Sequence, residues 1–189
     1  MEDYRFPTRD VFTAMKESGE LPFGQVPLLV VGDGDAKIPQ SSAILRYICL
    51  LGGLAPADSV AAARVDAIVA AEGDAFAALG VVKYRARNGL GFLDDATAER
   101  ALQEQRTDVV PRHLRHFEAI LAASQSGWAA GTERPSAADF AWGTSLRDIA
   151  VGINAAVPAA TLDALPKTKA FMAKFLALKQ VEEYYAAFP

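Results

Sequence analysis

The feature that most constrains the fold is a long helical periodicity that begins near residue 60 and occupies most of the chain. Between Val60 and about Tyr84, apolar residues recur every three or four positions, which places them on one face of a helix. These residues are Val65, Ile68, Val69, Phe76 and Leu79. Alanine, the best helix former, is abundant from Ala55 onward. The pattern predicts a bundle in which apolar helix faces pack on one another.

Further helices are expected after this one. Asp94-Asp95 predicts the start of a long helix, because an aspartate side chain can accept from the N–H groups of the first turn. Pro111 lies inside that helix and is expected to kink it. Ser136 and Asp139 have capping-box spacing, in which each side chain satisfies a backbone N–H of the other. The remaining expected elements are a helix over 167–178 and a turn around Tyr184.

The first fifty residues have a different pattern, with short apolar segments separated by glycine and proline. Leu28 to Val31 and Ala36 to Ile38 flank a glycine-containing turn, which predicts a β-hairpin. Ser41 or Ser42 is expected to cap a helix that ends at Gly52-Gly53.

Weaker signals precede the hairpin: residues 4–6 could form a short strand, and residues 8–18 a helix. A short linker is expected over 54–59, which contains a proline and several small residues. The sequence therefore predicts two domains, over 1–53 and 59–189.

Composition narrows the class of protein. Hydrophobic residues make up 51% and charged residues 22% of the 189, which is ordinary for a globular protein and excludes a disordered chain. The net charge of −4 lacks the basic excess of nucleic-acid binders, so no nucleic-acid partner is expected. No apolar run reaches the roughly 18 residues of a membrane helix, and the charged start carries no signal segment. We therefore expect a cytoplasmic protein without a membrane partner.

Side chains that could bind a metal or act as a nucleophile have plainer interpretations. Cys49 is the single cysteine, which excludes an internal disulfide and a four-cysteine zinc site and favours a reducing compartment. Its position in mid-helix predicts a buried structural residue. His113 and His116 lie among Arg112 and Arg115, which disfavour a cation. We expect a solvated basic face there and no metal site.

Two segments before residue 46 leave alternatives open. Pro27 could simply begin a strand, or the Val26–Pro27 bond could be cis and turn the backbone of Val26 outward for an extended peptide. Gln40-Ser41-Ser42 lies at a helix N-terminus. That place could be a simple serine cap or a site for a carboxylate or phosphate.

These segments carry a resemblance. Leu21-Pro-Phe-Gly-Gln-Val-Pro-Leu-Leu, the hairpin and then Gln40-Ser-Ser-Ala-Ile-Leu-Arg-Tyr47 resemble the glutathione transferases, particularly the sigma-like group. The capping box and the closing helix resemble that family's helical domain, so the resemblance covers nearly the whole chain. It implies a mainly α, two-domain fold, with a thioredoxin-like α/β glutathione-binding domain over 1–53 followed by an all-α helical bundle.

The resemblance also implies a glutathione site. Val26, ahead of a cis Pro27, would pair its backbone with the cysteinyl part of the tripeptide. Gln40 and Ser41 would hold the γ-glutamyl carboxylate.

The other end of glutathione involves further residues by resemblance. Lys16 would bind the glycyl carboxylate and Gln25 would assist it. Phe12 stands where the family often has tryptophan, so an indole hydrogen bond to that carboxylate is lost. Asp74 would reach across a homodimer interface to the γ-glutamyl amine, with Glu72 nearby as a competing assignment.

The family pattern further implies a first strand and helix before Tyr4, about 25 residues in all, so the N-terminal domain is expected to be incomplete. That segment supplies the tyrosine or serine hydroxyl that stabilises the glutathione thiolate, and neither Tyr4 nor Tyr47 corresponds to it. No catalytic residue is therefore identified.

The function implied is a glutathione S-transferase that conjugates glutathione, its co-substrate, to hydrophobic electrophiles in detoxification. The alternative is a non-catalytic glutathione-binding or structural member of the family. Phe76, Tyr84 and Trp142 could line the pocket for the electrophile or belong to the core. Lys83, Arg85 and Arg87 are expected to be solvated at a helix end.

Overall fold

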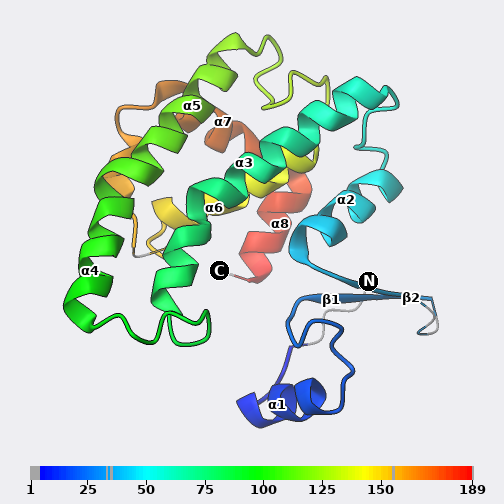
Figure 1. Cartoon of the computed structure of the whole chain (residues 1–189). Helices are drawn as coiled ribbons and strands as arrows, with labels where there is room; N and C mark the ends of the chain where they lie inside the picture. The colour runs from blue at the N-terminus through cyan, green and yellow to red at the C-terminus, as the bar shows by residue number, and fades with distance from the viewer. Residues whose placement is uncertain (1–4, 33, 35, 155, 189) are drawn as a thin grey trace. The chain divides into compact units, whose positions relative to one another are not determined.

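A computed structural model describes residues 5–32, 34, 36–154 and 156–188 of the chain. It divides into two compact units, of which the first ends at Gly53 and the second begins at Leu54. Figure 1 labels the helices and strands of both units. The fold is mainly α, with one small sheet. In the described part of the chain, no helix has both the length and the apolar character needed to cross a membrane.

The first unit is built around the predicted hairpin. Its elements in chain order are α1 (Arg9–Glu17), β1 (Leu28–Val31), β2 (Ala36–Pro39) and α2 (Ser41–Leu51). The two strands pair antiparallel, with Leu28 opposite Pro39 and Val31 opposite Ala36. The predictions of the hairpin and of a helix within residues 8–18 are confirmed.

The prediction of a strand over residues 4–6 is wrong for the two of these residues that the structure describes. Tyr4 lies outside the described residues, and Arg5 and Phe6 are not in a strand. A strand needs a neighbouring strand for its backbone groups, and the sheet described here consists of β1 and β2 alone. The ring of Phe6 instead packs against that of Phe12, at 5.7 Å between centroids.

The predicted serine cap of α2 is also wrong. The helix begins at Ser41, so the cap position belongs to Gln40, whose side chain makes no capping hydrogen bond. The carbonyl of Gln40 accepts the first hydrogen bond of the helix, from the N–H of Ile44 at 3.0 Å. Both serines therefore lie inside the first turn.

In the described residues of the second unit, all of the regular secondary structure is helical. Its helices are α3 (Ser59–Lys83), α4 (Asp95–Glu104), α5 (Val110–Ala123), α6 (Ala137–Ala150), α7 (Pro166–Leu176) and α8 (Lys179–Ala187), with a short 3₁₀ turn, η2 (Ala159–Leu162). Helix α3 packs on α6, and α7 packs on both α5 and α6 (Figure 1). The final segment thus forms two helices, where one helix and a turn were expected.

The helix that starts after Asp94 is interrupted, as its proline predicted. A π-helical turn, η1 (Gln105–Val109), separates α4 from α5, and Pro111 is the second residue of α5. Proline has no N–H to donate to the carbonyl of Thr107, four residues earlier. The wider turn is one of the ways in which a helix accommodates such a break.

Aromatic side chains form the core of the second unit. The rings of Phe117 and Trp142 stack at 4.2 Å, and the indole N–H of Trp142 donates to the carbonyl of Ile68 at 2.9 Å. Trp142 is 2% exposed, which assigns it to the core. Aromatic pairs of this kind add about 0.5–1.5 kcal/mol beyond the area that they bury.

The capping box at the start of α6 is confirmed and lies within this core. Asp139 is fully buried, and its two oxygens accept from the N–H groups of Ala129 and Ser136, each at 2.7 Å. Burial raises the pKa of Asp139, and these hydrogen bonds oppose the rise. A buried carboxylate is tolerated only with such partners, so Asp139 ties the loop at Ala129 to the helix start.

Candidate functional site

The hairpin register brings two of the predicted segments together. Because Leu28 pairs with Pro39, the residues just before β1 and just after β2 lie at the same end of the hairpin. Val26 and Pro27 precede β1, and the bond between them is cis. Gln40 follows β2 and leads into α2. The first unit therefore places Val26 beside the start of α2.

Gln40 has an unusual backbone conformation at this end of the hairpin. Its φ of 73° and ψ of 119° lie in a region that residues with a Cβ rarely adopt. Holding a side chain there costs about 1–3 kcal/mol, and such residues cluster at ligand-binding positions. The side chain of Gln40 is exposed. This conformation was not visible in the sequence, where the expected cap was a serine.

The first turn of α2 can receive an anion. The N–H groups of a helix's first turn have no partner within the helix, and the dipole makes this end positive. No acidic residue lies in the first turn of α2, and Ser41 adds an exposed hydroxyl donor. The arrangement suits a carboxylate or a phosphate group.

Lys16 approaches the same loop from the end of α1. Its stem lies against Gly24, where an added Cβ would stand 3.2 Å from Lys16 Cε and 3.4 Å from Cγ. Gly24 closes a turn by donating its N–H to the carbonyl of Leu21 at 2.9 Å, and Leu21 is buried. Among the ion pairs within the described ranges, none involves Lys16. The role of Gly24 was missed, although the Pro-Phe-Gly turn pattern pointed to a turn there.

The two remaining residues of the first unit extend this arrangement. Phe12 lies one turn before Lys16 on α1, so both occupy the same helix face. Its ring contacts Phe6 at an interplanar angle of 59°. Gln25 is exposed between Gly24 and Val26. The predicted residues of the first unit thus follow one path from the end of α1, along the loop, to the start of α2.

Asp74 and Glu72 belong to the second unit, on α3. Asp74 is exposed, and its part in the site stays a prediction. Glu72 has a structural partner, because its carboxylate accepts a hydrogen bond from the hydroxyl of Ser145 on α6. Burial raises the pKa of Glu72, and the hydrogen bond from Ser145 opposes this. Glu72 therefore helps to join α3 to α6.

The prediction that Cys49 is a buried residue of a helix is confirmed, since it is 4% exposed and lies in α2. The rings of His113 and His116 are 6.4 Å apart between centroids, and His116 is exposed. Across the part of the chain that the structure describes, no group of three or more potential metal ligands occurs.

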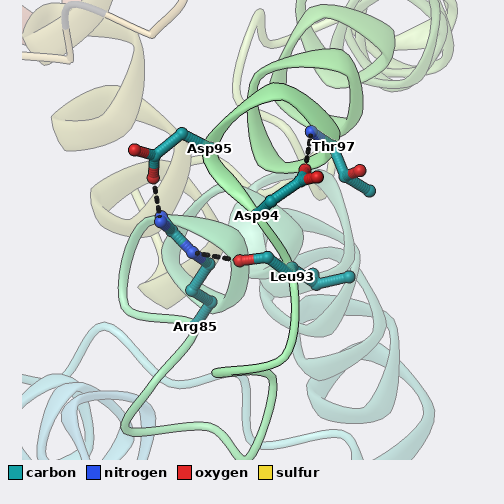
Figure 2. A network of polar contacts seen from close by, with 5 residues as sticks. All are labelled: Arg85, Leu93, Asp94, Asp95 and Thr97. Atoms are coloured by element: carbon teal, nitrogen blue, oxygen red, sulfur yellow. Dashed lines mark hydrogen bonds and ion pairs between the residues drawn. The ribbon is translucent and has the colours of Figure 1, made fainter.

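Arg85 was expected to be solvated together with Lys83 and Arg87, but it is bonded to neighbouring residues. Figure 2 shows its guanidinium donating to the carbonyl of Leu93, at 3.1 Å, and pairing with the carboxylate of Asp95. Beside it, Asp94 accepts from the N–H of Thr97 at 2.7 Å. Hydrogen bonds from the side chain and the backbone of Thr97 lower the pKa of Asp94. Arg85 thus fastens the loop after α3 to the start of α4, while Tyr84 remains 54% exposed.

Comparisons with known proteins bear on the family to which the chain is similar. Residues 87–187 match the family model of the glutathione S-transferase C-terminal domain. A glutathione S-transferase of Anopheles gambiae is 31% identical over 113 residues, which are 60% of this chain and 50% of that protein. Glutathione S-transferase 1 of Ascaris suum is 35% identical over 130 residues, or 69% of this chain and 59% of that protein. The chain therefore spans little more than half the length of these curated relatives.

A solved structure supports the fold as a whole. Prostaglandin synthase D of Nilaparvata lugens has a TM-score of 0.81 and 22% identity to this chain. The match covers 100% of this chain and 85% of that one. At this identity the likeness shows the fold alone.

Proposed function

The chain belongs to the glutathione S-transferase family, and on that premise we propose that it binds glutathione and conjugates it to electrophilic small molecules. One observation carries the proposal. The path from Lys16 through residues 24–27 to Gln40 and Ser41 offers, in order, a cation, the exposed residues 25–27 and a helix N-terminus. An extended peptide with a carboxylate at each end needs such an arrangement.

Each part of glutathione has a complementary group. The start of α2, with Gln40 and the hydroxyl of Ser41, would hold the γ-glutamyl carboxylate. The backbone of Val26, ahead of Pro27, would pair with the cysteinyl residue. Lys16 would neutralise the glycyl carboxylate, with Gln25 beside it. Hydrogen bonds to charged groups typically contribute about 1.5–3 kcal/mol each, so these contacts would raise the affinity for glutathione.

The reaction requires the thiolate form of glutathione. A free thiol has a pKa near 8.5, and a hydrogen-bond donor aimed at the sulfur would lower it. The thiolate then forms a bond to the electrophilic carbon, and the leaving group departs with its electron pair. The thiol proton passes to solvent. We propose a hydrophobic electrophile as co-substrate, without a metal.

Assembly and location complete the proposal. We infer a homodimer in the cytoplasm, in which Asp74 reaches the glutathione of the partner, and domains over 1–53 and 59–189. Size-exclusion chromatography with light scattering measures the molar mass and so tests the dimer. Limited proteolysis tests the domain boundary, because cleavage is expected within 54–58. A protein that elutes as a monomer at micromolar concentration would contradict the proposed role of Asp74.

Retention on immobilised glutathione tests the site directly. The double variant Gln40→Ala with Ser41→Ala should lose at least tenfold in affinity, because one charged hydrogen bond of about 1.5 kcal/mol corresponds to that factor. The matched control changes two exposed residues of the second unit, Gln103→Ala with Gln180→Ala, and should be retained like the wild type. Equal retention of both variants would overturn the assignment.

Catalysis is tested separately with a chlorinated nitroarene, whose conjugate is followed by absorbance. A glutathione thioether that forms at a rate proportional to the enzyme concentration supports transferase activity. Retention on glutathione with no conjugation above the uncatalysed rate would support the non-catalytic alternative.

A further inference from the structure

The contact between Lys16 and Gly24 has a consequence for ligand recognition. Lysine carries its charge on a flexible four-carbon stem, and fixing that stem costs up to about 2 kcal/mol of rotamer entropy. In the first unit Lys16 is exposed, but its stem lies beside Gly24: Cγ, Cδ and Cε all lie within 4 Å of where a Cβ of Gly24 would be.

Residue 24 is glycine for two separable reasons. Its φ is +60°, a left-handed value that disfavours residues with a Cβ. Its missing side chain also leaves the space that the Lys16 stem occupies. The turn from Leu21 to Gly24 holds this backbone in place, with Leu21 only 4% exposed. The stem therefore lies against a backbone that is anchored.

We propose that Gly24 is a positioning residue for Lys16, holding the ammonium group where it meets the terminal carboxylate of a peptide ligand. The ligand in this statement rests on the proposed function, whereas the packing of Lys16 on Gly24 does not. A side chain at position 24 would require the stem to move by a few tenths of an ångström. The ammonium would then lose its fixed place and much of its preference for a charged carboxylate.

Gly19 supplies a matched control. Its φ of +79° is also left-handed, and a Cβ there would meet no atom of the described chain within 4 Å. Asparagine tolerates left-handed conformations better than most residues. Gly24→Asn and Gly19→Asn therefore carry the same kind of backbone cost, and only the first one places a side chain against the stem of Lys16.

The packing is measured first, without any ligand. Reductive methylation with ¹³C-formaldehyde labels the lysines, and the signal that is missing from Lys16→Arg identifies Lys16. Gly24→Asn should shift and sharpen this signal because the stem is released, whereas Gly19→Asn should leave it unchanged. An unchanged signal in Gly24→Asn would overturn the proposal whatever the protein binds.

Binding is then measured by calorimetry with glutathione and with its glycyl monoethyl ester, which lacks the terminal charge. The wild type and Gly19→Asn should bind glutathione with about fivefold higher affinity than the ester. That factor corresponds to the free energy of one ion pair between exposed groups. Gly24→Asn should bind the two ligands equally, and in a Lys16→Ala background it should have no further effect on this preference. A preference that survives in Gly24→Asn overturns the proposal. A wild type that binds neither ligand contradicts the proposed function, and the ligand-free signal then decides the role of Gly24 alone.

Discussion

The helical unit buries stacked aromatic rings, whereas the hairpin unit buries few side chains and exposes most of its polar groups. In the second unit, Trp142 and Phe117 lie almost wholly out of solvent. In the described part of the first unit, Leu21 and Cys49 are the only hydrophobic residues that are buried. Since burial of apolar area dominates stability, the comparison indicates that stability resides mainly in the second unit. The groups suited to ligand binding lie in the first.

The largest expected effect concerns the aromatic core. Trp142→Ala should cost about 3–5 kcal/mol of unfolding free energy, because it removes a stacked ring and leaves a cavity. Urea unfolding followed by far-UV circular dichroism measures this. Trp142→Phe keeps a ring but loses the hydrogen bond to Ile68, and should cost roughly 1 kcal/mol. Equal losses in both variants would show that the stack contributes little.

The next effect comes from close packing of two helices. A Cβ at Gly143 would stand 2.6 Å from a ring carbon of Phe175, so Gly143→Ala should destabilise by about 1–3 kcal/mol. Gly80 is the matched helical glycine, since a Cβ there meets nothing in the described chain within 4 Å. Gly80→Ala should instead stabilise by about 0.5–1 kcal/mol. Thermal unfolding of both variants checks the opposite signs.

A third effect depends on pH. Glu118 on α5 accepts from the backbone N–H groups of Lys167 and Thr168, at 2.8 and 2.7 Å, and so caps α7. Burial alone would raise the pKa of Glu118, but these hydrogen bonds and the hydroxyl of Thr168 outweigh it and lower the pKa. Its contribution is therefore complete above its ordinary pKa of 4.5 and is lost as the pH falls through the lower folded value.

Glu118→Ala should cost about 1 kcal/mol at neutral pH, as the loss of a helix cap does. The deficit should shrink as the pH falls below 4.5. Glu104→Ala, at an exposed position on α4, serves as the control and should change stability by less than about 0.5 kcal/mol at either pH. A deficit that is constant down to acid pH would contradict the capping role.

The smallest expected effect lies in the hairpin unit and has the opposite sign. Gln40→Gly should stabilise by up to about 1 kcal/mol, because glycine adopts the positive φ without strain. It should also weaken glutathione binding, since the amide is lost. Gln40→Ala retains the strain and should weaken binding without stabilising. Unfolding and calorimetry on both variants separate these results, and an equally stable pair would show that Gln40 stores no strain.

Much of the fold could be predicted because its signals are local. The hairpin at 28–39, the caps at Asp94 and Ser136, and the break at Pro111 each depend on residues a few positions apart. The strand expected at residues 4–6 fails in its described part because a strand also needs a neighbour. Arg85 was assigned to solvent because its partner Leu93 comes after a loop whose path the sequence does not specify.

For the candidate site too, the sequence predicted some features, and others became visible only in the structure. The resemblance to the family predicted Lys16, Val26, Gln40 and Ser41 as site residues from their positions along the chain. The proposed function rests on these residues. Their mutual placement needed the strand register and the turn at Gly24. The strain at Gln40 was invisible in the sequence, because a glutamine has no local reason to adopt a positive φ.

By itself, the sequence determined the helical class of the second unit, the hairpin of the first and the residue types available to bind an anionic peptide. Hydrophobic periodicity, capping residues and turn residues act over one or two helical turns, so they can be read along the chain. The tertiary structure alone decided that Lys16 lies on Gly24, that Gln40 occupies the cap position of α2 and that Arg85 fastens a loop. Those contacts depend on where the chain returns in space, which is set by packing across many residues.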